Sequence, residues 1–152
     1  MCKTRTGYTD GRSKVGTQSS RTNVFMDAFR NPSLGLFLVR LALAAVFIGH
    51  GISKFVNLDG TVGFFEMLGL PAATAYLIAT VETLGGIAML LGIWTRIAGI
   101  LLACVMVGAI YLVKFKTGFV GGWEFDATLL LAALGITFTG PGDWSLGKRK
   151  ER

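Results

Sequence analysis

The fold is decided by an apolar stretch in the first third of the chain, residues 34–55, which reads LGLFLVRLALAAVFIGHGISKF. A helix needs about 20 mainly apolar residues to cross a bilayer, because each residue adds about 1.5 Å. This stretch is long enough, and its ionisable residues are Arg40, His50 and Lys54. It therefore predicts a membrane-spanning helix.

Three further spans follow, at residues 72–93, 97–113 and 123–139. The second span carries Glu82 as its only charge, the third carries none, and the short fourth span is followed by Gly-Pro-Gly at 140–142. The short connection at 94–96 forces the second and third spans into an antiparallel hairpin. The sequence thus predicts an all-α protein, a four-transmembrane-helix antiparallel bundle.

The connection after the first span is longer and mostly apolar. Between Val62 and Leu70, bulky apolar residues surround a lone charge, Glu66. This pattern predicts a short helix lying in the membrane interface between the first two spans. Gly69 and Pro71 would end that helix and begin the next span.

Composition supports a membrane protein. The chain is 52% hydrophobic and 16% charged, whereas soluble domains carry about 25% charged residues. Its net charge of +6 comes from basic ends that flank apolar runs, which argues for lipid and against nucleic acid as a partner. We expect a disordered basic cytoplasmic tail at 1–33, a membrane domain at 34–147 and a second basic tail at 148–152. Translation from Met1 or from Met26 stays open.

The distribution of Lys and Arg predicts the orientation. With both termini in the cytoplasm, eleven of the 15 basic residues lie inside, and only Lys54, Lys114 and Lys116 lie outside. Positive residues favour the cytoplasmic side. We therefore expect a multi-pass protein of the cell (inner or plasma) membrane with both termini inside.

Metal and disulfide chemistry is not expected from this chain alone. Cys2 lies in the polar tail and Cys104 in an apolar span, so the two are not expected to pair. His50 is the only histidine, and no zinc-like or cluster-like spacing occurs. We expect no metal site and no redox cofactor bound by this chain alone.

A polar cluster is expected inside the bundle, since ionisable groups at bilayer depth are costly and usually find partners. Arg40, His50 and Lys54 share one face of the first span, and Glu82 is surrounded on its helix by small residues. Helical rise puts Glu82 between Arg40 and His50 in height. We expect Arg40 to reach Glu82, either as a structural ion pair or as part of a binding site.

Two acids open the fourth span at its outer end, Glu124 and Asp126. Acids at a helix N-terminus favour a capping or surface role, and Lys114 and Lys116 nearby are interpreted as the solvated end of a helix. Glu124 is nevertheless kept as a fifth candidate site residue beside the polar cluster.

The ordered motifs of the chain resemble the DoxX family, which includes the DoxD-like proteins. The resemblance covers about residues 34–147 and rests on RLALAAVFIGHGISKF (40–55), FEMLGLP (65–71), ETLGGIAMLLGIWTR (82–96), GGWE (121–124) and GPGDWSL (140–146). Gly147 stands where the family often has an acid. The resemblance implies a four-helix membrane protein with a link to redox chemistry, because some relatives are membrane subunits of a thiosulfate:quinone oxidoreductase.

We therefore expect a membrane subunit of a quinone-linked oxidoreductase or redox-protective complex. A soluble or membrane partner would supply the redox cofactors, and this chain would anchor it. Quinone would be bound through Arg40, His50 and Lys54 as donors, with Glu82 relaying a proton. A small transporter and a non-catalytic scaffold are the rival interpretations, and whether the chain is an enzyme or a homo-oligomer stays open.

Overall fold

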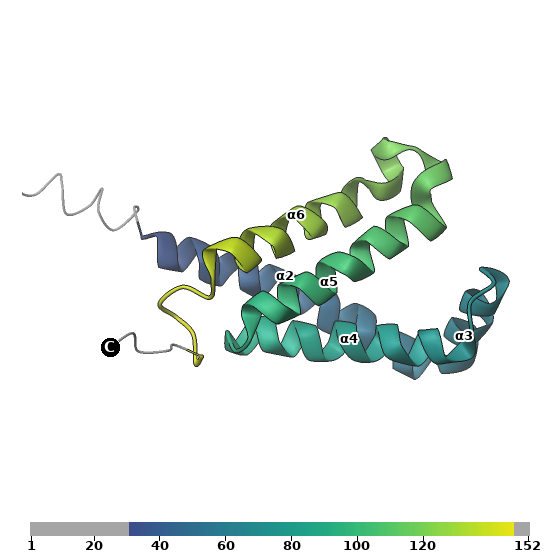
Figure 1. The fold of residues 1–152 in the computed structure, drawn as a ribbon, viewed down its shortest axis with the longest axis horizontal. Helices are drawn as coiled ribbons and strands as arrows, with labels where there is room; N and C mark the ends of the chain where they lie inside the picture. The colour runs from purple at the N-terminus through teal and green to yellow at the C-terminus, as the bar shows by residue number, and fades with distance from the viewer. Residues whose placement is uncertain (1–30, 148–152) are drawn as a thin grey trace, which may run out of the picture. The chain divides into compact units, whose positions relative to one another are not determined.

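The computed structural model describes residues 31–147, and the predictions about residues 1–30 and 148–152 lie outside the described residues. Every regular element in the described part is helical, as predicted (Figure 1). The elements are α2 (Pro32–Val56), α3 (Leu58–Met67), α4 (Ala72–Leu91), α5 (Thr95–Ala109), three short turns η1 (Ile110–Lys114), η2 (Phe115–Thr117) and η3 (Phe119–Trp123), and α6 (Glu124–Thr139).

Four segments are long and apolar enough to cross a membrane, which confirms the predicted number of spans. They are Pro32–Val56, Ala72–Leu91, Thr95–Thr117 and Phe119–Thr139. The third and fourth run further than predicted, because the expected loop between them forms the turns η1, η2 and η3. The predicted short helix between the first two spans is α3.

The hairpin between α4 and α5 is made by a left-handed turn. Gly92 ends α4 with φ 71°, and its N–H donates to the carbonyl of Ala88 at 2.9 Å. Glycine adopts this conformation without a steric cost, so it commonly ends helices. Trp94 follows with φ 46°, and α5 begins at Thr95, two residues earlier than predicted. The turn returns α5 alongside α4.

The bundle is built from two closely packed helix pairs, α2 with α4 and α5 with α6, joined through contacts between α4 and α5. Glycines bring the backbones together: a Cβ on Gly51 would lie 2.8 Å from the backbone nitrogen of Thr83, and one on Gly86 would lie 3.0 Å from that of Ile48. Small residues allow such close packing in lipid. The buried apolar core is Leu43, Ala44, Phe47, Met89, Ala98, Leu102, Ala103, Met106, Leu129, Ala133 and Ile136.

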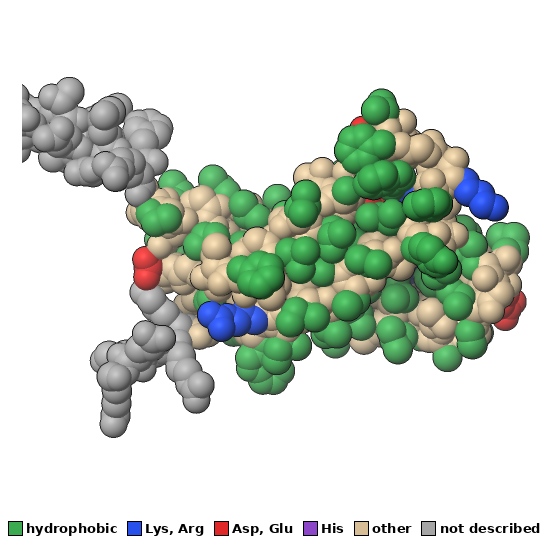
Figure 2. Space-filling view, turned by 45° about the horizontal axis from the view of Figure 1, so that its top comes forward, with side chains coloured by type: hydrophobic (Ala, Val, Ile, Leu, Met, Phe, Trp, Pro, Cys, Tyr) green, Lys and Arg blue, Asp and Glu red, His purple; other side chains and the backbone are tan. Residues whose placement is uncertain are grey.

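The outside of the bundle is largely hydrophobic. Figure 2 shows one face on which hydrophobic side chains spread along the helices, while charged side chains lie toward the two ends. Exposed leucines and isoleucines occur on α2, α4 and α5, and an exposed apolar surface of this extent fits contact with lipid.

A segment after α6, residues 140–147, packs across the beginning of α2. The hydroxyl of Ser33 donates to the carboxylate of Asp143, and the rings of Phe37 and Trp144 lie 5.6 Å apart. The N–H of Leu146 donates to the carbonyl of Leu91 at 3.0 Å. This segment, called the C-terminal strap below, covers the turns of α2 that lie beyond the end of α4.

Candidate functional site

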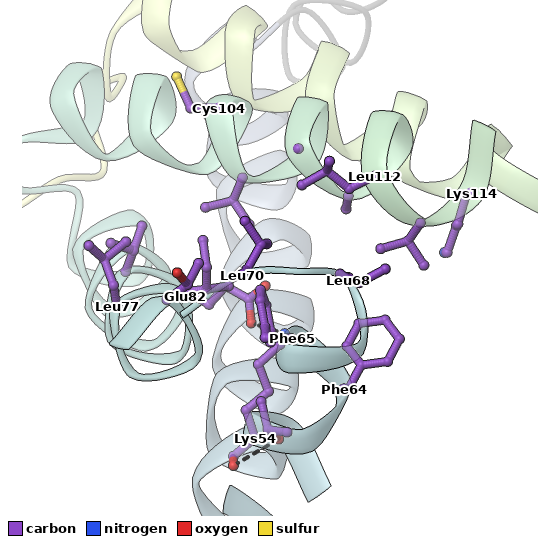
Figure 3. Close-up of a pocket in the computed structure, with 18 of the residues that line it drawn as sticks. Lys54, Phe64, Phe65, Leu68, Leu70, Leu77, Glu82, Cys104, Leu112 and Lys114 are labelled. Atoms are coloured by element: carbon purple, nitrogen blue, oxygen red, sulfur yellow. Dashed lines mark hydrogen bonds and ion pairs between the residues drawn. The ribbon is translucent and has the colours of Figure 1, made fainter. Parts of the chain in front are cut away.

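A cavity of about 550 Å³ lies where the end of α2, the short helix α3, the first half of α4 and the last turns of α5 meet (Figure 3). Its walls are mainly apolar, with Phe64, Phe65 and Leu68 contributed by α3 and the turn that follows it. Leu77 and Leu112 line the cavity and are also exposed on the outside of the bundle. The cavity is therefore open at the surface of the bundle, and its size is typical of a small-molecule site.

One ion pair forms the most buried polar group of the cavity. Lys54, in the last turn of α2, donates its ammonium group to the carboxylate of Glu82 on α4. Glu82 is only 3% exposed, and Lys54 is half-buried. Two charges are costly to bury, and each is tolerated here because the other compensates it. Breaking the pair would leave a single charge in an apolar wall.

A second ion pair lies beside the cavity. Lys114, the last residue of the π-helical turn η1, lines the cavity and pairs with Asp126 of α6 at 2.7 Å. Asp126 is buried. Lys114 was expected to be solvated, and its side chain is indeed 37% exposed. The π-helical turn, which no sequence pattern signalled, also brings it into the cavity lining.

The predicted contact between Arg40 and Glu82 is wrong. Arg40 is 1% exposed, and its guanidinium donates to four backbone carbonyls at 2.7–3.0 Å. Two of these carbonyls, of Met89 and Leu90, end α4, and the other two belong to Pro141 and Trp144 in the C-terminal strap. Arg40 therefore joins α4 to the strap and lies outside the cavity lining.

The error came from the register of α2 against α4. The close contacts of Gly51 with Thr83 and of Gly86 with Ile48 place Glu82 near Gly51, one helical turn from Lys54. An alignment of the two spans by their predicted ends places Glu82 too close to Arg40. In the structure the first turns of α2 extend beyond α4 and are covered by the C-terminal strap.

The other two predicted site residues also lie apart from the cavity. His50 is exposed on α2, so the expectation that it faces the bundle interior is wrong. Glu124 is exposed at the start of α6, and its carboxylate accepts a hydrogen bond from the N–H of Gly121 at 3.1 Å. The N-cap of α6 is Trp123 and no side chain caps it, so this contact joins Glu124 to the turn η3 instead of capping α6. Of the five candidates, the cavity lining includes only Lys54 and Glu82.

Sequence reasoning missed the polar neighbours of the ion pair, Asn57 and Thr61, which line the cavity from the start of α3. The hydroxyl of Thr61 donates to the carbonyl of Asn57 at 2.8 Å. The available signal was weak: both residues sit one or two turns after Lys54, and only the bend between α2 and α3 brings them to the same wall.

The arrangement favours a mostly apolar ligand that accepts hydrogen bonds. Rings or hydrocarbon chains would pack on the leucines and phenylalanines, while the Lys54 ammonium and the Asn57 amide provide donors. Among residues 31–147, no group of three or more His, Cys, Asp or Glu residues is placed to hold a metal ion.

Four bilayer-length helices around a mainly apolar cavity define a small multi-pass membrane protein. The DoxX family model matches residues 35–115, more than half of the chain, and the chain belongs to the DoxX family.

Three relatives illustrate what is recorded for similar proteins. "Putative oxidoreductase CatD" of Bacillus subtilis is 43% identical, over 70% of this chain and 80% of its own. "Uncharacterized membrane protein Rv3486" of Mycobacterium tuberculosis is 39% identical, over 73% and 78%. "Inner membrane protein YqjF" of Escherichia coli is 27% identical, over 76% and 91%. No solved structure matches the chain.

Proposed function

We propose that this chain is the quinone-binding membrane subunit of an oxidoreductase, and that quinone enters the cavity between α3, α4 and α5 from the bilayer. The observation that carries the proposal is the Lys54–Glu82 ion pair in the wall of an otherwise apolar cavity that is open at the surface of the bundle. The oxidoreductase name of the Bacillus subtilis relative supports the redox class.

The lining fits a quinone in shape and chemistry. A quinone has an apolar ring and hydrocarbon tail, which match the aromatic and aliphatic walls, and carbonyl oxygens, which accept hydrogen bonds. Lys54 would donate to one carbonyl, because its ammonium has three N–H donors and Glu82 occupies one. When bound, quinone would take up two electrons and two protons.

Glu82 would contribute in two ways. It holds Lys54 against the cavity wall through their ion pair, and a buried carboxylate in this position is suited to pass protons to the ligand. A partner protein would deliver the electrons, and anchoring that partner is the second part of the proposed role.

The test is purification of the full chain in mild detergent, followed by mass spectrometry of the bound lipids and quinones. We expect copurified quinone in the wild type and its loss in the double variant Lys54→Met/Glu82→Gln, which removes both charges without leaving one unpaired. Glu66→Gln is the matched control, since Glu66 is an exposed acid on α3 outside the cavity lining.

Thermal unfolding of the same samples separates a binding site from a structural ion pair. The proposal predicts that the double variant unfolds near the wild-type temperature and yet carries no quinone. A double variant that unfolds much earlier but retains quinone would show that the pair is a structural support. Wild-type protein without quinone, even after quinone is added to it, would overturn the proposal.

A further inference from the structure

The cavity has polar groups on two opposite walls. Lys54 extends from the end of α2 below the cavity, and Lys114 extends from η1 above it, with Phe64, Phe65 and Leu68 between them (Figure 3). Each lysine has its own acid: Glu82 for Lys54, and Asp126 for Lys114 at 2.7 Å. The two acids belong to different helices, α4 and α6.

The charge around the cavity is balanced, because two cations face two anions. An anionic ligand would gain attraction from the lysines and lose it through repulsion from Glu82 and Asp126, so it has no unmatched cation to bind. A cationic ligand would be attracted by the two acids and repelled by the two lysines. A neutral ligand meets no such repulsion at either wall, so the cavity favours a neutral molecule.

Both lysines retain donors after pairing. An ammonium group has three N–H bonds and no acceptor. Lys54 uses one of them in its hydrogen bond to Glu82, whereas Lys114 lies 2.7 Å from Asp126 Oδ2 as an ion pair without a hydrogen bond to that oxygen. The two opposite walls therefore offer hydrogen-bond donors separated by apolar surface. A ligand that satisfies both walls needs an acceptor at each end and an apolar middle.

The end of α5 is built to bring Lys114 into this wall. The helix changes at Ile110 from α-helical to π-helical winding, which adds a residue to the turn. Since each residue rotates an α-helix by about 100°, one added residue changes the direction in which Lys114 points. The turn places Lys114 so that it both lines the cavity and pairs with Asp126.

We propose that Lys114, held by Asp126, is a second hydrogen-bonding residue of the cavity, and that the two lysines together select a neutral ligand with a carbonyl oxygen at each end. This inference rests on the proposed function and deepens it. It assigns the ligand to the class of apolar diones, in which the ring separates the two carbonyls, and assigns Lys114 a binding role.

The experiment compares a dione with its monoketone. The full chain in lipid nanodiscs is titrated with 9,10-anthraquinone and with anthrone, in which a methylene group replaces the second carbonyl. One hydrogen bond to a charged group corresponds to a factor of about ten or more in affinity. We expect the wild type to bind the dione about tenfold more tightly than the monoketone. Equal affinities would overturn the inference.

The double variant Lys114→Met/Asp126→Asn tests whether Lys114 is the second donor. It removes the lysine and its acid together, so the charges around the cavity stay balanced. Its affinity for the dione should fall about tenfold, and its affinity for the monoketone should stay the same. Lys116→Met is the matched control, because Lys116 is an exposed lysine two residues further on that does not line the cavity, and it should change neither affinity. Unchanged dione binding in the double variant would overturn the role of Lys114.

The outcomes separate this inference from the proposed function. If dione binding depends on Lys54 and Glu82 but does not change in the Lys114 variant, the binding role of Lys114 is overturned and the proposed function stands. A wild-type protein that binds neither compound would overturn both proposals. Where the double variant fails to fold, equal affinities of the wild-type protein for the two ligands would still overturn the inference.

Discussion

Arg40 carries a buried charge whose hydrogen bonds within residues 31–147 all go to backbone carbonyls. Its guanidinium donates to four backbone carbonyls, two of them at the end of α4. Carbonyls at a helix C-terminus have no partner within the helix and carry partial negative charge, so a cation there is stabilised. Gly92 leaves room for it, since a Cβ at that position would lie 2.8 Å from the guanidinium carbon.

Replacing Arg40 by lysine should destabilise the bundle strongly. Lysine keeps the charge, but its single ammonium cannot match the planar fork that bridges α4 and the C-terminal strap. Unsatisfied buried groups cost about 1–3 kcal/mol each, so we expect a marked fall in the unfolding temperature in detergent. Arg96→Lys, at an exposed arginine in the adjacent hairpin, is the control. Equal unfolding temperatures for both variants would refute this role of Arg40.

The sequence predicted several individual residues well. Glu82 was expected to face the bundle, and it is buried; Lys54 was placed on an inward face, and it pairs with Glu82. The pairing itself was not predictable from helical rise, because rise gives height within one helix and not the offset between two helices. His50 was misjudged because it lies at the edge of the polar face of α2, on the side that turns toward the surface.

At the level of elements, two glycines fix the register of α2 against α4. Gly51 meets the backbone of Thr83, and Gly86 meets that of Ile48, so neither position has room for a side chain. The register in turn brings Lys54 within reach of Glu82. These contacts link helix packing directly to the geometry of the cavity.

Gly51→Ala should disrupt the bundle, whereas Gly49→Ala on the same helix should not. The added methyl group at position 51 would overlap Thr83, and overpacking typically costs about 1–3 kcal/mol. At position 49 nothing lies within 4 Å, and alanine favours the helix over glycine by about 1 kcal/mol. Unfolding temperatures of the two variants provide the measurement. A Gly51→Ala protein as stable as the Gly49→Ala protein would contradict the packing described above.

The elements could be predicted because apolar length is a strong signal, and their ends could not. The third span was expected to stop at residue 113, yet helical turns continue through η1, η2 and η3 with a kink at Val120 and Gly121. A π-helical turn has no distinctive composition, so the place of the partly exposed Lys114 in the cavity lining was not predicted. For this reason the cavity wall that contains Lys114 could not be predicted from the sequence.

For the whole molecule, the distribution of basic residues predicts which end of the bundle faces the cytoplasm. Reporter fusions at Gly60 in α3 and at Gly118 between η2 and η3 should report the outside, and a C-terminal fusion should report the inside. The cavity, which adjoins α3 and η1, would then open in the outer half of the bilayer. A cytoplasmic signal from Gly60 would reverse this topology.

The fold and the family followed from ordered motifs spread over most of the chain, whereas the site did not. Long apolar runs and short connections leave few arrangements for four helices. The cavity depends on the bend between α2 and α3, on the register of the helices and on the turns after α5. No single sequence motif predicts any of these features.

Photolabelling tests the quinone-binding cavity most directly. The full chain in lipid nanodiscs is irradiated with an azido-quinone, and the labelled residues are mapped by mass spectrometry, with and without excess decylubiquinone. The cavity predicts labels in α3, the first half of α4 and η1 that the excess quinone suppresses. Labels spread over the lipid-facing surface, or concentrated beside Arg40 and the C-terminal strap, and unaffected by excess quinone would contradict it.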